Sequence, residues 1–176
     1  LGHPPPDPEN DRWGKLTAPF SAQLDVTGYN YLVSRYEADG KTFPQRVMAG
    51  TETFPHQAFA YWDATRQRSY VIGDFVWTAL DYLGEAGIGK VYVDEKLSFA
   101  AAYPYHFANC GDFDICGFKR PQSYYRDILW GVREAPYIAV LPPALHGKKI
   151  AFSPWGWEPV IESWTFPGWE GKPVTV

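Results

Sequence analysis

Three short apolar runs, separated by stretches with helical character, are the feature that most constrains how this sequence can fold. The runs cover residues 25–33, 46–50 and 70–79. The first run is rich in β-branched and aromatic side chains, which is typical of a buried strand, and the other two runs are further strand candidates. Between them, residues 34–38 leave room for about a turn or two of helix, and residues 56–68 form a longer helical stretch. Buried strands that alternate with helices predict parallel β/α units.

Turn-forming residues dominate the segments outside these units. Residues 1–23 open with the proline-rich stretch 3–8, which is loop material because proline removes a hydrogen-bond donor and fixes φ. Residues 82–118 predict a long loop that is rich in glycine and aromatic side chains. Pro121 suits the first position of a helix that continues to about Trp130.

The C-terminal part of the sequence predicts a different kind of structure. Residues 159–164 alternate like an antiparallel strand, and residues 173–176 begin another. Three parallel strands cannot close a barrel, and an open sheet of three would leave long unpaired edges. We therefore expect a fragment that holds the end of one domain and the first strands of a second.

The composition excludes several classes of partner. Net charge is −4 and no basic patch is present, so we expect no nucleic-acid or membrane-surface partner. No apolar run approaches the ~20 residues of a membrane-spanning helix, and no signal peptide is visible. No cysteine and histidine cluster has zinc-site spacing, so we expect no metal. Cys110 and Cys116 are compatible with a disulfide or with two thiols.

Polar and aromatic residues follow the three predicted strands. The strand ends are residues 29–31, 51–53 and 77–82, which include an amide, a carboxylate, an indole and several phenols. Side chains at the carboxyl ends of parallel strands face the active site in β/α barrels, so these groups would converge on one rim. Aromatic residues make up 18% of the chain, enough to line a site that stacks against flat apolar faces such as those of sugars. This set of groups favours carbohydrate as the substrate.

At these positions the sequence resembles glycoside hydrolase family 2, the β-galactosidase and β-glucuronidase family. The motifs that carry the resemblance are Gly28-Tyr29-Asn30-Tyr31, Gly50-Thr51-Glu52-Thr53-Phe54-Pro55, Gly73-Asp74-Phe75-Val76-Trp77-Thr78 and Asp81-Tyr82-Leu83-Gly84-Glu85. Their order and spacing match the sixth to eighth strands of that family's barrel. Residues 112–121 resemble the segment before its last helix, and residues 162–176 resemble the entry to the β-sandwich that follows.

The resemblance implies an α/β fold in two parts. Residues 1–155 would form the C-terminal part of a (β/α)8 TIM barrel, about strands 6–8. Residues 156–176 would be a linker and the first strands of an immunoglobulin-like β-sandwich.

The resemblance also implies a retaining, cofactor-free mechanism with two glutamates. The nucleophile of the family maps onto Glu52. The acid/base belongs to an Asn-Glu pair, and this sequence holds only the reversed Glu9-Asn10. Retaining chemistry needs two carboxyl groups about 5–5.5 Å apart. We therefore expect that the chain does not hydrolyse glycosides alone and needs the N-terminal half of the barrel as its partner.

Other site residues are assigned by the same resemblance. Tyr31 or Tyr36 would hydrogen-bond the nucleophile, Asn30 would contact a sugar hydroxyl, and Trp77 would floor the pocket. Asp81 and Glu85 would bind hydroxyls or cap the loop. Simpler interpretations stay open: a lone glutamate after a strand often serves a helix start, and such aromatic residues often lie in a core.

The substrate is expected to be a terminal β-galactoside. Family β-glucuronidases carry an Asn-x-Lys pair after the eighth strand, whereas Asn109 is followed here by Cys110 and Gly111. The alternatives are a β-glucuronidase or β-mannosidase type of enzyme, a non-catalytic carbohydrate-binding module, and a structural half-barrel. Exposed strand edges would favour self-association. For the parent enzyme, a periplasmic or secreted location is favoured.

Overall fold

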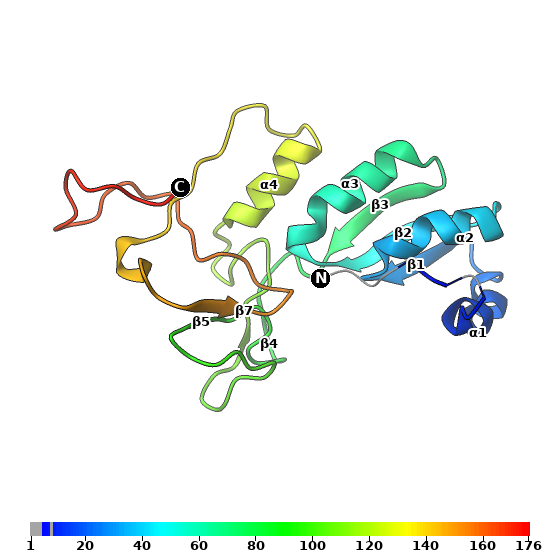
Figure 1. The fold of residues 1–176 in the computed structure, drawn as a ribbon, viewed down its shortest axis with the longest axis horizontal. Helices are drawn as coiled ribbons and strands as arrows, with labels where there is room; N and C mark the ends of the chain where they lie inside the picture. The colour runs from blue at the N-terminus through cyan, green and yellow to red at the C-terminus, as the bar shows by residue number, and fades with distance from the viewer. Residues whose placement is uncertain (1–4, 8) are drawn as a thin grey trace. The chain divides into compact units, whose positions relative to one another are not determined.

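The computed structural model describes residues 5–7 and 9–176. The chain divides into two compact units, Leu1–Val76 and Trp77–Val176, coloured blue to cyan-green and green to red in Figure 1. Part of the proline-rich stretch 3–8 lies outside the described residues. The domain boundary expected at residue 155 stays a prediction.

A parallel three-stranded sheet in the order β1-β2-β3 forms the centre of the first unit. The strands are β1 (Val26–Asn30), β2 (Val47–Thr53) and β3 (Val71–Val76). All three predicted strands are therefore present and parallel. The pairing of β1 with β2 shifts between Tyr29 and Asn30, so that Asn30 lies opposite Glu52. This irregularity places both polar residues at the carboxyl edge of the sheet.

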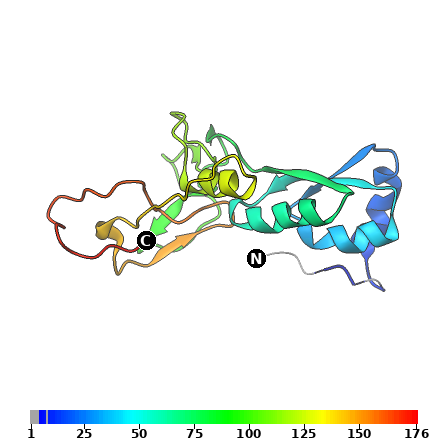
Figure 2. The same cartoon turned by 90° about the horizontal axis from the view of Figure 1, so that it is seen from above.

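Helices cover one face of this sheet (Figure 1 and Figure 2). They are the short η1 (Val33–Arg35) and α2 (Tyr36–Thr42) between β1 and β2, and η2 (Pro55–Gln57) and α3 (Ala58–Gln67) between β2 and β3. The core between helices and sheet consists of buried residues from both layers: Tyr29, Tyr36, Met48, Tyr61, Ala64 and Val71. Strand β1 alternates strictly between exposed and buried residues, as expected for a sheet with one covered face.

The first unit also contains a helix that the sequence analysis did not predict. Helix α1 (Arg12–Ser21) begins after Asp11, whose carboxylate accepts a 2.9 Å hydrogen bond from the Gly14 N–H. Such an N-cap satisfies a backbone donor that has no partner inside the helix. The helix was not predicted because the proline-rich stretch before Asp11 indicated a loop.

The second unit has one α-helix and two small antiparallel sheets. Helix α4 (Pro121–Leu129) starts at its proline, as predicted. The sheets pair β4 (Tyr82–Leu83) with β6 (Phe107–Ala108), and β5 (Val91–Val93) with β7 (Ile150–Phe152). A 3-10 turn, η3 (Pro143–Leu145), precedes β7.

The core of the second unit gathers around Ile88, Ala108 and Cys110, with Trp77 and Trp155 packed against it. Burial raises the pKa of the Cys110 thiol to about 12. Cys116 is exposed, and both cysteines are free thiols. Of the two possibilities, the structure contains two free thiols and no disulfide between them.

Two fold predictions go beyond what the structure contains. Residues 159–164 and 173–176 form no strand, only isolated bridges from Ile161 to Val140 and from Thr175 to Leu141. Prolines at 159 and 173 remove the donors that a regular ladder would need. The described residues thus make a mixed α/β structure with small sheets, and neither a closed barrel nor a sandwich is present among them. Within the same residues, no helix is long and apolar enough to cross a membrane.

Candidate functional site

Glu52 lies near the carboxyl end of β2 and is half-buried. The Tyr31 hydroxyl donates a 2.8 Å hydrogen bond to Glu52 Oε2, and the Tyr31 N–H donates another of 2.8 Å to the Glu52 carbonyl oxygen. The tyrosine therefore contacts both the main chain and the side chain of the glutamate. A hydrogen bond to one carboxylate oxygen holds the group in place and leaves the other oxygen to act.

An unusual backbone conformation places the Tyr31 ring. Its φ is 58°, in the left-handed region that non-glycine residues rarely adopt. The ring stacks on Phe54 with centroids 4.2 Å apart and an interplanar angle of 23°. Left-handed backbone in a bulky residue costs about 1–2 kcal/mol and persists where surrounding contacts hold it. Here the two hydrogen bonds to Glu52 and the stacked ring supply those contacts.

Asn30, the last residue of β1, lies on the exposed face of that strand. The Thr51 hydroxyl donates a 2.6 Å hydrogen bond to Asn30 Oδ1, which leaves the Asn30 Nδ2 hydrogens to donate elsewhere. Gly28 makes room for this contact, since a Cβ there would lie 2.7 Å from the Thr51 side chain. Glu52, Tyr31 and Asn30 are thus brought together at one edge of the sheet, as predicted, while their roles stay predictions.

Tyr36 does not belong to this group. It is 1% exposed, and its ring packs edge-on against Tyr29 and Tyr61, with centroids 5.5 Å and 6.0 Å away. Burial raises the pKa of its phenol far above the usual value. Of the two tyrosines proposed to bond the nucleophile, only Tyr31 does so. The assignment of Tyr36 is wrong because the helix after η1 turns its ring into the core.

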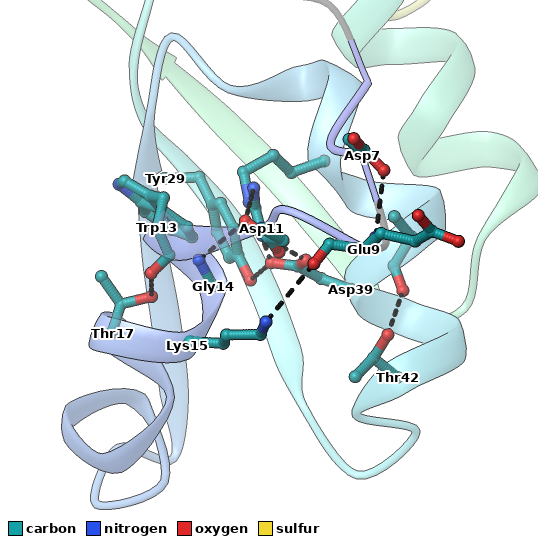
Figure 3. A network of polar contacts seen from close by, with 12 residues as sticks. Asp7, Glu9, Asp11, Trp13, Gly14, Lys15, Thr17, Tyr29, Asp39 and Thr42 are labelled. Atoms are coloured by element: carbon teal, nitrogen blue, oxygen red, sulfur yellow. Dashed lines mark hydrogen bonds and ion pairs between the residues drawn. The ribbon is translucent and has the colours of Figure 1, made fainter.

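A buried ionic network joins helix α1 to α2 and β1 (Figure 3). Arg35 binds the carboxylates of Asp11 at 2.6 Å and Asp39 at 2.8 Å, and its guanidinium lies 4.2 Å from the centre of the Trp13 ring. The Tyr29 hydroxyl donates a 2.8 Å hydrogen bond to Asp39. Burial raises the Tyr29 pKa to about 12. The network ties helix α1 to the strand that carries Asn30, and sequence reasoning missed it.

A chain of hydrogen bonds in the second unit links two predicted site residues, Trp77 and Glu85, through Tyr82. The Trp77 indole N–H donates a 3.2 Å hydrogen bond to the Tyr82 hydroxyl, and that hydroxyl donates a hydrogen bond to the Glu85 carboxylate. Burial and the bond to Glu85 raise the Tyr82 pKa well above its usual range. The Trp77 and Tyr82 rings meet edge-on at 6.0 Å. Trp77 is therefore partly a core residue of its unit, and Glu85 is exposed at the end of the chain of bonds.

The Asp81 carboxylate has a structural partner instead of a sugar hydroxyl. Arg120 binds both of its oxygens at 2.6 Å, and the Gly111 N–H donates a third hydrogen bond of 2.9 Å. Asp81 is 4% exposed. Three hydrogen bonds and burial favour the alternative that Asp81 fixes the loop. Its role in binding sugar hydroxyls stays a prediction.

Solved structures and a curated protein are similar to this chain. No family model matches the chain. A glycosyl hydrolase family 2 member from Bacteroides cellulosilyticus superposes with a TM-score of 0.72 and 43% sequence identity, covering 92% of this chain and 20% of that one. A second crystal structure of a family 2 member from Bacteroides cellulosilyticus DSM 14838 gives a TM-score of 0.64 and 39% identity, covering 90% and 18%. This chain is similar to part of a family 2 glycoside hydrolase.

A curated protein is also similar over half of the chain. It is a "Putative beta-glucuronidase" of Formosa agariphila, 31% identical over 88 residues, which are 50% of this chain and 7% of that protein. The chain thus spans about a fifth of the solved family 2 chains it matches and less of the curated relative. The relatives support family 2 in general and do not distinguish its β-galactosidases from its β-glucuronidases.

Proposed function

We propose that this chain is the part of a retaining family 2 glycosidase that carries the catalytic nucleophile. The observation that carries the proposal is the hydrogen bond from Tyr31 to Glu52 at the carboxyl edge of a parallel sheet. Similarity to family 2 structures over 92% of the chain supports it. In β/α enzymes this edge is where catalytic side chains gather.

The chemistry divides between Glu52 and a second carboxyl group. A Glu52 oxygen attacks the anomeric carbon, the bond from that carbon to the leaving oxygen breaks, and a glycosyl ester forms. The leaving oxygen takes its proton from the acid/base group, which then deprotonates the water that cleaves the ester. Tyr31 holds one Glu52 oxygen so that the other faces the sugar, and Asn30 Nδ2 donates to a sugar hydroxyl.

The acid/base group is supplied from outside these 176 residues. No Asn-Glu dipeptide occurs in the sequence. The chain by itself therefore does not hydrolyse glycosides, and a partner segment with an N-terminal half-barrel completes the site. Ile72 and Phe75, which are 58% and 69% exposed on β3, also favour association between copies of the isolated chain.

A terminal β-galactoside is the proposed substrate, with a β-glucuronide as the second candidate. The missing Asn-x-Lys motif after β3 favours the galactoside. The similarity to a putative β-glucuronidase favours the alternative. Nitrophenyl β-galactoside and nitrophenyl β-glucuronide, given separately to an enzyme that contains this chain, distinguish the two. A non-catalytic carbohydrate-binding module would bind sugars and hydrolyse neither.

Covalent trapping tests the nucleophile directly. A 2-deoxy-2-fluoro galactosyl fluoride should label an active enzyme containing this chain, and the modified peptide should carry the sugar on Glu52. Glu52→Gln should abolish labelling and turnover, whereas Glu37→Gln, on the exposed side of α2, should leave both unchanged. A label on another carboxylate, or full activity of Glu52→Gln, would overturn the assignment.

A further inference from the structure

A cavity of about 630 Å³ lies wholly within residues 89–162 of the second unit. This volume falls in the range of ligand sites, which run from about 300 to 1,000 Å³. Its walls combine the aromatic side chains of Tyr105, Tyr137 and Trp157 with polar and charged groups. None of the residues assigned above to glycoside hydrolysis lines it, so its function is argued separately from the proposed activity.

One wall of the cavity carries a cation that has no acidic partner. The Lys90 ammonium lies 4.4 Å from the centre of the Tyr92 ring and 5.1 Å from that of Tyr105. Within the described part of the chain it forms no ion pair and no side-chain hydrogen bond. The other two cations in the lining are both engaged, because Arg120 binds Asp81 and Lys119 binds Asp127. Lys90 is therefore the cation that remains to meet a ligand.

A second donor lines the same cavity. The Tyr105 hydroxyl donates a hydrogen bond to Asn109 Oδ1, which fixes the amide and leaves its Nδ2 hydrogens to donate. Gly89 permits the close approach of the two segments, since a Cβ at that position would lie 2.5 Å from the Asn109 carbonyl oxygen. An ammonium and an amide N–H₂ thus line one cavity through the packing of residues that are far apart in the sequence.

The rest of the lining suits a hydroxylated ring. Trp157 offers an aromatic surface for stacking, whereas one face of Tyr137 is already covered by Tyr124, with ring centroids 4.1 Å apart. Glu158 and Glu162 are exposed acceptors for hydroxyl groups, and the Asp114 carboxylate already accepts from the N–H groups of Cys116 and Phe118. With a single unpaired cation and nearby carboxylates, the cavity disfavours a ligand that carries two negative charges.

We propose that this cavity binds a saccharide with one negative charge, its anionic group on Lys90 and Asn109 and its ring against Trp157. The charge comes from a uronate carboxylate or from a sulfate ester, and both groups accept hydrogen bonds from an ammonium and an amide. Neutral sugars of the same size lack the contact with Lys90 and bind more weakly. The site is a binding site, and no bond is made or broken there.

Titration of the 176-residue protein followed by ¹H–¹⁵N NMR tests the proposal. Glucuronic acid and galactose 6-sulfate are the anionic probes, and galactose is the neutral one. We expect a Kd of about 1 mM for at least one anionic probe, with shifts at the Trp157 indole and the Asn109 side-chain amide. Preference between the two anionic sugars identifies the source of the charge.

Matched variants give the test its control. Lys90→Met keeps a long apolar side chain on the two tyrosine rings and should weaken binding of the anionic sugar about tenfold or more. Lys90→Arg should retain most of the affinity. Lys96→Met makes the same charge change on an exposed loop and should have no effect. Glu52→Gln should also leave binding unchanged, so failure of the hydrolase proposal and failure of this one are distinguishable.

Three results would overturn the site. They are an absence of shifts at roughly 10 mM sugar, equal affinity for galactose and the anionic sugars, and unchanged binding in Lys90→Met. If Lys90→Met fails to fold, which its far-UV circular dichroism would reveal, Lys90→Arg and Asn109→Ala replace it. Loss of anion preference in Asn109→Ala supports the proposal, and its persistence opposes it.

Discussion

Tyr31 and Glu52 are joined twice, through a backbone hydrogen bond of 2.8 Å and a side-chain hydrogen bond of 2.8 Å. The tyrosine adopts left-handed backbone to make both contacts. A side chain held this way has few alternative positions, so the carboxylate is already oriented, as the proposed role of nucleophile requires. Orientation of this kind is a major source of catalytic rate.

Removal of the Tyr31 hydroxyl should be measurable in the chain itself. Tyr31→Phe keeps the ring on Phe54 but loses the bond to the carboxylate, so the free energy of unfolding should fall by about 1 kcal/mol. Urea unfolding followed by circular dichroism measures the change. Tyr103→Phe, whose side chain is 87% exposed, is the control and should change stability little. Equal stability of Tyr31→Phe and the parent would argue against the bond.

Arg35 should matter far more to stability than an exposed cation. Arg35 and Asp39 are 5% and 2% exposed, and Arg35→Met would leave two carboxylates without their main partner. The expected loss is about 3–5 kcal/mol. Lys41→Met breaks the exposed Lys41–Glu37 pair, whose side chains are 75% and 61% exposed, and should cost about 0.5 kcal/mol or less. Similar losses in both variants would contradict a buried network.

Acid should weaken the first unit through Asp11. Hydrogen bonds from Arg35, and then from the Gly14 N–H, hold the pKa of Asp11 below its ordinary value of 3.8. Because the folded pKa is the lower one, this stabilisation is complete above pH 3.8 and is lost as pH falls through the folded pKa. Asp11→Asn should therefore show a flatter loss of stability below that pH than the parent.

The control for this pH dependence is Asp25→Asn, at an exposed carboxylate that makes no hydrogen bond within the described residues. Its acid-unfolding curve should follow that of the parent. Thermal unfolding between about pH 5 and pH 2.5 gives both comparisons. If Asp11→Asn and the parent lose stability in parallel, the bond from Arg35 does not act as described.

The contributions of Asp81 and Arg120 to stability should be strongly coupled. Their paired hydrogen bonds of 2.6 Å predict a coupling energy of about 2–3 kcal/mol in a double-mutant cycle of Asp81→Asn and Arg120→Met. The exposed pair Asp94–Lys148 should give about 0.5 kcal/mol in the same measurement. If the two variants lower the free energy of unfolding additively, the two side chains are not coupled, and the Asp81 carboxylate is available to bind a ligand.

The sequence predicted best the elements that depend on local pattern. The three apolar runs became β1, β2 and β3, and Pro121 marked the start of α4. The rest depended on contacts between distant residues. The pairing of Asp81 with Arg120 spans 39 positions, and no local signal reports it.

The choice between Tyr31 and Tyr36 shows the same limit. Both follow β1, and what separates them is a left-handed turn at Tyr31 and the burial of Tyr36 by α3. Helix α1 was missed although Asp11 is a favoured N-cap residue, because the preceding prolines predicted a loop. A search for capping residues next to proline-rich stretches would have found it.

The clasp between Asp81 and Arg120 also suggests how the second unit can be engineered. The clasp joins residues 81 and 120, at the two ends of the intervening segment. Residues 95–97 within it are exposed and make no side-chain hydrogen bond or ring contact among the described residues, and exposed loop tips tolerate added length at small entropic cost. A fluorescent reporter or affinity peptide inserted there would leave the clasp, and the packing that it anchors, undisturbed.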